Sequence, residues 1–98
     1  MGSAIKDISG TPPPPPPPLP VANFSYTTSG LFAEFTDHST APSGAIKTHA
    51  WTFGDGGTSS VSNPTHFYAK PGTYSVTELV TDGIGATDAE TTPVTVSH

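Results

Sequence analysis

The chain has 98 residues, carries a formal net charge of -5 and contains no cysteine. Its length allows one small domain. Beyond residue 20 the only basic residues are Lys47 and Lys70, and nucleic acids and anionic membranes need a basic surface, so the composition excludes both as partners. No segment has the apolar length of a membrane span. A small domain without disulfides must be stabilised by sheet packing or by a metal.

The first twenty residues form a separate compositional block. Residues 1–7, "MGSAIKD", lack the apolar region of a signal peptide, and the initial Met-Gly-Ser is of the kind that cloning introduces. Seven consecutive prolines follow at 12–18. Such a run adopts polyproline II and spans roughly 20 Å. We predict that residues 1–20 are a linker that holds an upstream partner at a distance; the alternative is a ligand for a proline-binding groove.

From Val21 onward, short runs alternate apolar and polar residues and are separated by turn signals. The turn signals include "TTSG" at 27–30, "GDGG" at 54–57 and "KPG" at 70–72, which has the residue order of a type II turn. No segment has a helical apolar stripe. We predict an all-β fold: an immunoglobulin-like antiparallel β-sandwich of about seven strands over residues 21–98, present as a monomer. The predicted strand segments are 21–30, 31–37, 45–53, 58–64, 65–69, 70–83 and 86–98.

The segment "GAIKTHAWTFGDGGTSSVSNPTHFYAKPGTYSVTELVTDGIG" resembles the PKD domain family, and the similarity extends over essentially all of residues 21–98. The family pattern has Gly-x-Ile, Trp-x-Phe-Gly-Asp-Gly, Asn-Pro, an aromatic pair, Pro-Gly-x-Tyr-x-Val and Val-Thr-Asp in this order. The matching positions here are Gly44, Ile46, Trp51, Phe53 to Gly56, Asn63, Pro64, Phe67, Tyr68, Gly72, Tyr74, Val76 and Val80 to Asp82.

The resemblance implies an immunoglobulin-like module without enzymatic activity. Such modules are found in secreted bacterial proteases and chitinases and in cell-surface proteins, and the setting is most similar to the PKD modules of collagenolytic serine proteases. It therefore implies a secreted, extracellular accessory module that binds insoluble collagen beside a tethered catalytic domain. Two alternatives are an insoluble polysaccharide such as chitin as the ligand, in a glycoside hydrolase, and a spacer or cell-surface adhesion module without its own ligand.

Flat aromatic side chains are the expected ligand-binding residues, because they offer contact area at little conformational cost. The candidates are Trp51, Phe32, Tyr26 and Tyr68, with Phe67 as an alternative. Trp51 shares a strand face with Phe53, which predicts that it packs in the core; a partly exposed ring would also stack on a polymer. Phe32 lies on the face opposite Phe35 and is the candidate that parity places at the surface.

The residues Gly54, Asp55 and Gly56 are predicted to form a structural turn between two strands. Asp55 is expected to accept backbone N–H bonds, and Gly56 and Gly57 permit positive φ. The segment is too short for a phosphate-binding loop and lacks its lysine.

No catalytic or metal site is predicted. A serine nucleophile would be expected in a G-x-S-x-G elbow, which is absent from the sequence. The histidines at 38, 49, 66 and 98 match no zinc-ligand spacing and are interpreted as solvated strand residues. The resemblance also disfavours calcium, because calcium-binding members of the family carry acidic residues in the loop before Gly-x-Ile, whereas "STAPSG" at 39–44 has none. A calcium ion would have to use Asp37, Asp82 or Asp88 with backbone carbonyls. We therefore expect no cofactor.

Glu78 departs from the family pattern, which usually has an apolar residue at this position. Alternation from Tyr74 and Val76 points its side chain inward, and an unpaired buried carboxylate is costly. Two alternatives avoid the cost: a bulge at 77–79 that turns Leu79 inward, or a position near a sheet margin.

Overall fold

The structure is a computed structural model that describes residues 19–42 and 44–98. The proline run at 12–18 lies outside the described residues, and so does its predicted spacer role. Within the described part no helix is present, so none is long and apolar enough to cross a membrane. The seven strands are β1 (Phe24–Ser29), β2 (Phe32–Asp37), β3 (Ile46–Thr52), β4 (Thr58–Ser59), β5 (Thr65–Phe67), β6 (Gly72–Asp82) and β7 (Thr87–Val96).

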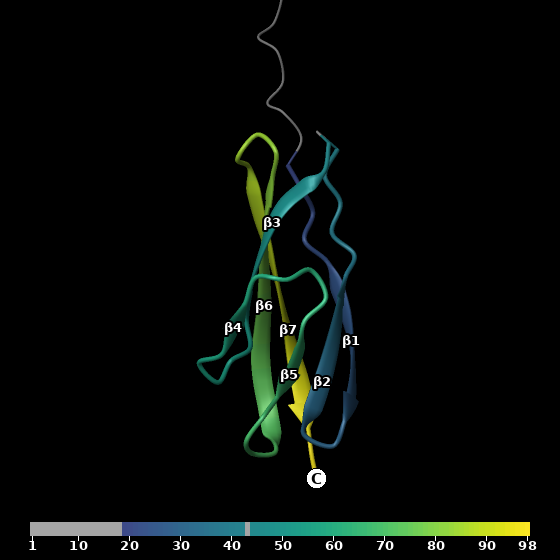
Figure 1. Cartoon of the computed structure of the whole chain (residues 1–98), viewed down its shortest axis with the longest axis vertical. Coiled ribbons are helices and arrows are strands. Elements are labelled where there is room, and N and C mark those ends of the chain that lie inside the picture. Colours follow the sequence, from purple (N-terminus) through teal and green to yellow (C-terminus); the bar gives the residue numbers. More distant parts are fainter. Residues whose placement is uncertain (1–18, 43) are drawn as a thin grey trace, which may run out of the picture.

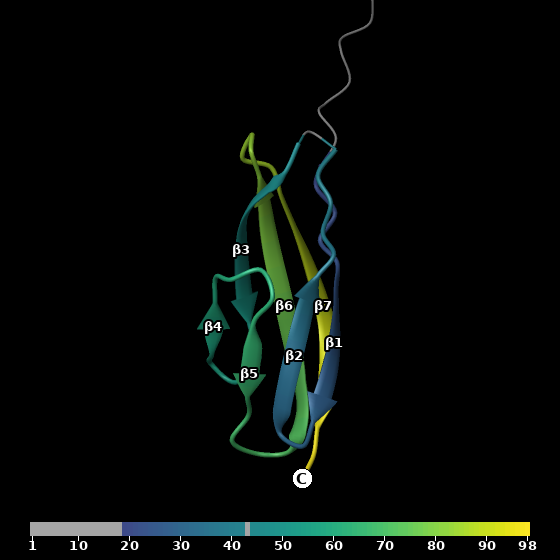
Figure 2. The same cartoon turned by 45° about the vertical axis from the view of Figure 1, so that its right-hand side comes forward.

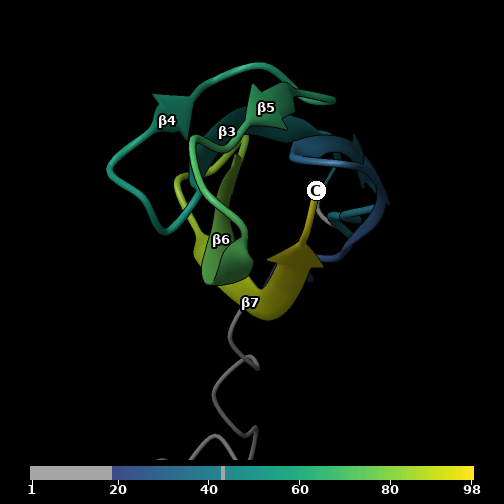
Figure 3. The ribbon, with the colours of Figure 1, turned by 90° about the horizontal axis from the view of Figure 1, so that it is seen from below.

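The strands form two antiparallel sheets that face each other. One sheet has the order β1-β2-β5 and the other has the order β4-β3-β6-β7. Figures 1 and 2 show the two sheets as separate layers, and the end-on view in Figure 3 shows that the layers face each other. The predicted all-β sandwich of about seven strands is confirmed.

Two predicted turns differ from the structure. β1 continues through Ser29, which pairs with Phe32, so the turn is the two residues Gly30 and Leu31 rather than the whole of "TTSG". Gly30 has a φ of 61°, which suits a tight hairpin. Gly72 has a φ of 155° and is already paired with Val96 in β6, so it is not the third residue of a type II turn.

Aromatic rings dominate the packing between the sheets. Trp51 lies 5.0 Å from Phe24 and 5.4 Å from Phe35, measured between ring centroids, and Phe53 lies 5.5 Å from Phe35. Ala33, Tyr68, Val76, Val94 and Val96 complete this buried cluster. Edge-on and offset contacts of this kind add stability beyond the buried area, which lets a cysteine-free domain hold together.

The inward positions of β6 change in character along the strand. Val76, Glu78, Val80 and Asp82 are all buried, whereas Leu79 is 41% exposed. The register with β3 and with β7 is continuous through residues 77–81. Both alternatives for Glu78 are therefore wrong: no bulge turns Leu79 inward, and Glu78 lies on a central strand, with its side chain inside the sandwich.

Candidate functional site

The described residues enclose no pocket. The candidate sites are an exposed aromatic surface on the smaller sheet and a buried polar cluster between the sheets.

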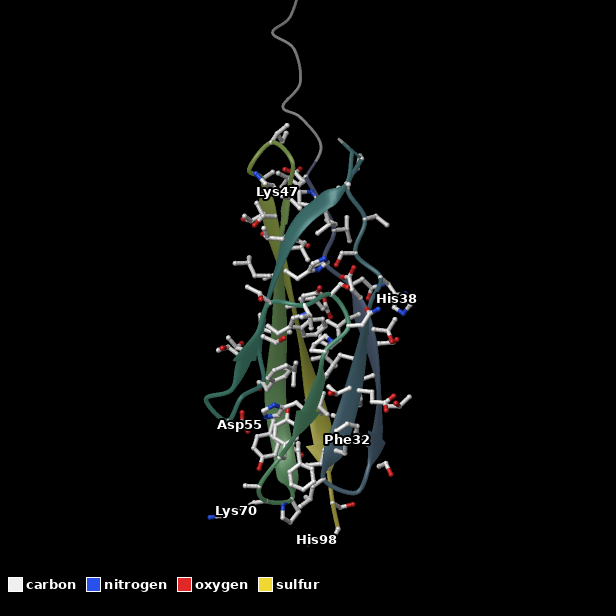
Figure 4. All side chains as sticks on the ribbon, viewed as in Figure 1. Phe32, His38, Lys47, Asp55, Lys70 and His98 are labelled. Carbon is white, nitrogen blue, oxygen red and sulfur yellow. The ribbon has the colours of Figure 1, made fainter. Side chains whose placement is uncertain are left out.

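Two phenylalanines lie side by side on the outer face of the β1-β2-β5 sheet. Phe32 of β2 is the register partner of Phe67 of β5. Ala33 and Phe35 of β2 are buried in the core, so the alternating Phe32 lies on the outer face, as parity predicts, although its side chain is half-buried there. Phe67 is 65% exposed. We name Phe32 and Phe67 the outer aromatic pair; Figure 4 places Phe32 at the end of the sandwich where His98 also lies.

Hydroxyl groups surround the outer aromatic pair. Ser29 is the register partner of Phe32 on β1, and Thr27 is the partner of Glu34, which in turn pairs with Thr65 on β5. Serine and threonine hydroxyls both donate and accept hydrogen bonds. An apolar centre surrounded by hydroxyl groups and the exposed Glu34 carboxylate suits contact with a polar polymer.

Two of the predicted ligand-binding aromatics are buried. Trp51 is 1% exposed, and its indole N–H donates to the carbonyl oxygen of Val61 at 2.9 Å. Tyr68 is fully buried, and its hydroxyl donates to the carbonyl oxygen of Phe53 at 2.8 Å. Neither ring has a face open to a polymer, so their predicted binding role is wrong for this structure, and Trp51 takes its core alternative.

Tyr26 occupies an intermediate position at the margin of the smaller sheet. Its ring centroid lies 6.2 Å from that of Phe35, and its hydroxyl donates across to the carbonyl oxygen of Pro93 on β7 at 3.4 Å. One side of the ring therefore packs on the core margin, and only the remainder is available to a ligand.

The turn after β3 contains Gly54, Asp55 and Gly56. Gly54 has a φ of 87° and Gly56 a φ of 97°, while Gly57 has no positive φ, contrary to the expectation for it. The Asp55 Oδ1 accepts the backbone N–H of Gly57 at 2.9 Å. A Cβ at Gly54 would lie 2.8 Å from the carbonyl oxygen of Ser75, so this position needs glycine for space as well as for its φ.

Asp55 also binds His66. The His66 Nε2 lies 2.8 Å from the Asp55 Oδ2, and the imidazole stacks on Phe53 at a centroid distance of 4.3 Å. Partial burial of Asp55 acts to raise the pKa of its carboxyl, but the hydrogen bonds from His66 and Gly57 outweigh it and lower that pKa. His66 is thus a packed and partnered residue rather than a solvated one.

A second histidine joins two carboxylates between the sheets. The His49 Nδ1 lies 3.0 Å from the Glu78 Oε2 and 3.8 Å from the Asp37 Oδ1. One ligand-type atom from each of the three residues lies within 4.8 Å of the other two. The interpretation of His49 as solvated is therefore wrong. We name Asp37, His49 and Glu78 the inter-sheet cluster, because β2 belongs to one sheet and β3 and β6 to the other.

Burial makes Glu78 the unusual member of this cluster. Its side chain is fully buried, and its Oε1 has no hydrogen-bond partner among the described residues. Desolvation, followed by the neighbouring Asp37 carboxylate, raises the pKa of Glu78 to about 8. For Asp37, partial burial acts to raise the pKa, yet the hydrogen bonds from Glu78 and Ser39 lower it. The pKa values of the two carboxyls are thus pushed in opposite directions, so that Asp37 loses its proton at lower pH than Glu78 does.

The comparisons with known proteins agree with this geometry. A family model described as "PKD domain" matches residues 15–97. The chain belongs to the PKD domain family. The PKD1 domain of Vibrio anguillarum Epp superposes with a TM-score of 0.82 at 36% identity, covering 84% of this chain and 98% of that one. The PKD1 domain of the Vibrio cholerae metalloprotease PrtV gives 0.79 at 38% identity, covering 82% and 99%.

Full-length relatives of this PKD domain carry protease names. Collagenase ColA of Bacillus cereus is 38% identical over 82 residues, which are 80% of this chain and 8% of that protein. A microbial collagenase of Vibrio alginolyticus is 45% identical over 62 residues, which are 63% of this chain and 8% of that protein. The chain thus spans about a twelfth of these relatives. Their names support a collagenase or metalloprotease setting and give no support to the expected serine protease.

A further structural neighbour comes from outside the protease relatives. A chain from a study of carbohydrate-binding modules of the β-sandwich superfamily superposes with a TM-score of 0.77 at 30% identity, covering 85% of this chain and 36% of that one.

The calcium candidates lie in separate hydrogen-bonded positions of the PKD domain. The Asp82 Oδ1 accepts the backbone N–H groups of Ile84 and Ala86 in the β6–β7 turn, at 3.0 and 2.9 Å. The Asp88 Oδ2 accepts the N–H of Ala22 at 2.8 Å. Neither belongs to the cluster that contains Asp37.

Proposed function

We propose that this PKD domain is a non-catalytic accessory module of a secreted bacterial collagenase or metalloprotease and that it binds insoluble collagen. The protease names of its relatives support the setting, and with it an extracellular location. Residues 1–20 are proposed as the spacer to a tethered catalytic domain.

The outer aromatic pair is the observation that carries the binding proposal. Phe32, which is half-buried, and the exposed Phe67 are register partners on a sheet face where serine, threonine and Glu34 lie around them. Collagen presents proline-type rings and backbone carbonyls along a rigid helix. Rings pack on rings and hydroxyls bind carbonyls, so the surface matches the chemistry of the fibre.

The contact of one such pair is weak, and the fibre offers it many times over. Retention at the fibre raises the local concentration of a tethered catalytic domain without any change in its chemistry. The module therefore assists degradation by placement alone, and it needs no pocket for this.

Co-sedimentation with insoluble collagen and with chitin tests the proposal. We expect collagen to retain the domain, and Phe32→Ala and Phe67→Ala each to weaken retention about tenfold, as for a central aromatic contact. Ile84→Ala is the matched control, because Ile84 is an exposed apolar residue in the β6–β7 turn at the opposite end of the sandwich (Figure 1). Equal losses in all three variants, or none, would refute a specific role for the pair.

A polysaccharide ligand is the second candidate, and the similarity to the carbohydrate-binding module structure favours it. Sugar rings stack on flat aromatics in the same way as proline rings. Retention by chitin and not by collagen, lost in Phe67→Ala, would select this function. Retention by neither polymer would leave a spacer or adhesion module without its own ligand.

A further inference from the structure

The geometry points to a structural metal site: we propose that the inter-sheet cluster binds one divalent zinc-type ion through Asp37, His49 and Glu78. The ion would connect β2 of one sheet to β3 and β6 of the other. This proposal does not rest on collagen binding.

The spacing of the three side chains suits a small tetrahedral ion. Zinc binds nitrogen and oxygen ligands at about 2.0–2.2 Å, which separates the ligand atoms of a tetrahedral site by roughly 3.3–3.6 Å. The two distances from the His49 Nδ1 are 3.0 and 3.8 Å, and all three ligand atoms lie within 4.8 Å of one another. Small side-chain movements therefore bring one imidazole and two carboxylates to zinc geometry, with water as the fourth ligand.

The buried Glu78 carboxylate supplies an independent indication. Its side chain is fully buried and its Oε1 has no hydrogen-bond partner among the described residues, although it lies beside a histidine and a second carboxylate. A buried oxygen without a partner is a costly feature unless something binds it. A cation bound to both oxygens of the Glu78 carboxylate would give Oε1 a partner and would neutralise the two carboxylates together.

The site is also supported and reachable. The backbone N–H of Ser39 donates to the Asp37 Oδ1 at 3.2 Å and so orients this carboxylate. Asp37 and His49 retain 14% and 16% side-chain exposure, which gives an ion a route from solvent to the fully buried Glu78. The imidazole nitrogen favours zinc over calcium, which takes oxygen ligands.

A metal ion at this site would stabilise the half of the sandwich whose inward residues are polar. The aromatic core fills the other half, and five of the eight acidic residues of the chain stand at inward positions here: Asp37, Glu78, Asp82, Asp88 and Glu90. With no cysteine for a disulfide, an ion would add a strong link between the sheets to the contact of His49 with Asp37.

Isothermal titration of the chelator-treated full chain with zinc chloride tests the proposal. We expect one ion per chain, and an affinity reduced at least about tenfold in His49→Gln and in Glu78→Gln. His66→Gln is the matched control, because His66 has one carboxylate partner but no second one within a metal cluster. Its affinity for zinc should equal that of the wild type.

Two further measurements keep the result decisive. Zinc should raise the melting temperature of the wild type and of His66→Gln, but not that of Glu78→Gln, which keeps the side-chain shape and the fold. Cobalt should give the visible absorption of a tetrahedral site in the wild type but not in Glu78→Gln. The proposal would be overturned if zinc did not bind, or if Glu78→Gln bound zinc as tightly as the wild type. It would also be overturned if His66→Gln lost as much zinc affinity as the cluster variants, or if calcium stabilised the domain in place of zinc.

Discussion

Glu78→Gln provides a direct test of the buried carboxyl in metal-free protein. The amide keeps the size and shape of the side chain, but it cannot ionise. Because the folded-state pKa of about 8 lies above the ordinary 4.5, the carboxyl favours folding fully below pH 4.5. That contribution is lost progressively as the pH rises from 4.5 to about 8. The glutamine variant lacks this loss.

The size of the effect follows from the two pKa values. The folded and ordinary pKa values differ by about three and a half units. One unit corresponds to about 1.4 kcal/mol, so the upper limit on the loss of unfolding free energy is roughly 5 kcal/mol. Side-chain movement and entering water reduce the cost of the buried charge, so we expect about 2–4 kcal/mol. Chemical unfolding at several pH values in a chelating buffer measures it as the difference in unfolding free energy between the two proteins.

Other titrating groups face Glu78, and the controls separate them. They are Asp37 from β2, His49 from β3 and Glu90 from β7, which is the register partner of Glu78. Asp37→Asn removes the neighbouring charge, so the unfolding free energy should fall less between pH 4.5 and about 8. Glu34→Gln, on the outer face of β2, should leave that fall unchanged. Parallel profiles for the wild type and Glu78→Gln would refute the reasoning, as would a wild type that gains stability relative to the variant at high pH.

Three further predictions concern the core and the turn. Trp51→Ala should cost about 3–5 kcal/mol of unfolding free energy in urea, because it empties the centre of the aromatic core. Gly54→Ala should cost about 1–3 kcal/mol from the φ and the close carbonyl oxygen, whereas Gly83→Ala, with open space and no positive φ, should stay within about 0.5 kcal/mol. Burial acts to raise the pKa of Asp55, but the hydrogen bond from His66 outweighs it and lowers that pKa. The ionised Asp55 therefore stabilises the fold above its ordinary pKa of 3.8, and this stabilisation is lost as the pH falls through the lower folded-state pKa. Acid unfolding should show this loss in the wild type and not in Asp55→Asn.

The fold was predictable because its signals are local. Alternation and turn residues predicted all seven strands, and the parity of Ala33 and Phe35 correctly placed Phe32 outside. Phe67 was harder, since it belongs to a three-residue strand beside a second aromatic, and parity alone does not say which of Phe67 and Tyr68 faces the core. The hydrogen bond of Tyr68 to the Phe53 carbonyl oxygen decides it.

The inter-sheet cluster was not predictable in the same way. Parity pointed Glu78 inward, and it was the energetic cost of an unpaired carboxylate that favoured a bulge or a margin instead. The carboxylate is not isolated, because the register of β3 on β6 brings His49 diagonally across to it and β2 supplies Asp37 from the opposite sheet. A contact among three strands far apart in sequence leaves no local pattern, so only the assembled sandwich reveals it.

Glu78 poses a choice between two kinds of stability. A leucine would extend the apolar core and remove a buried ionisable group, and such replacements are often neutral or stabilising. The glutamate therefore weakens the metal-free domain at neutral and alkaline pH, because the nearby Asp37 carboxylate adds to the cost of the buried charge and His49 recovers only part of it. An ion that binds all three residues reverses the balance, since it binds the folded state and not the unfolded one. Glu78→Leu should thus be more stable than the metal-free wild type at pH 8 and gain nothing from zinc. A leucine variant that is less stable than the metal-free wild type at that pH would show that the carboxyl is retained for packing and hydrogen bonding alone.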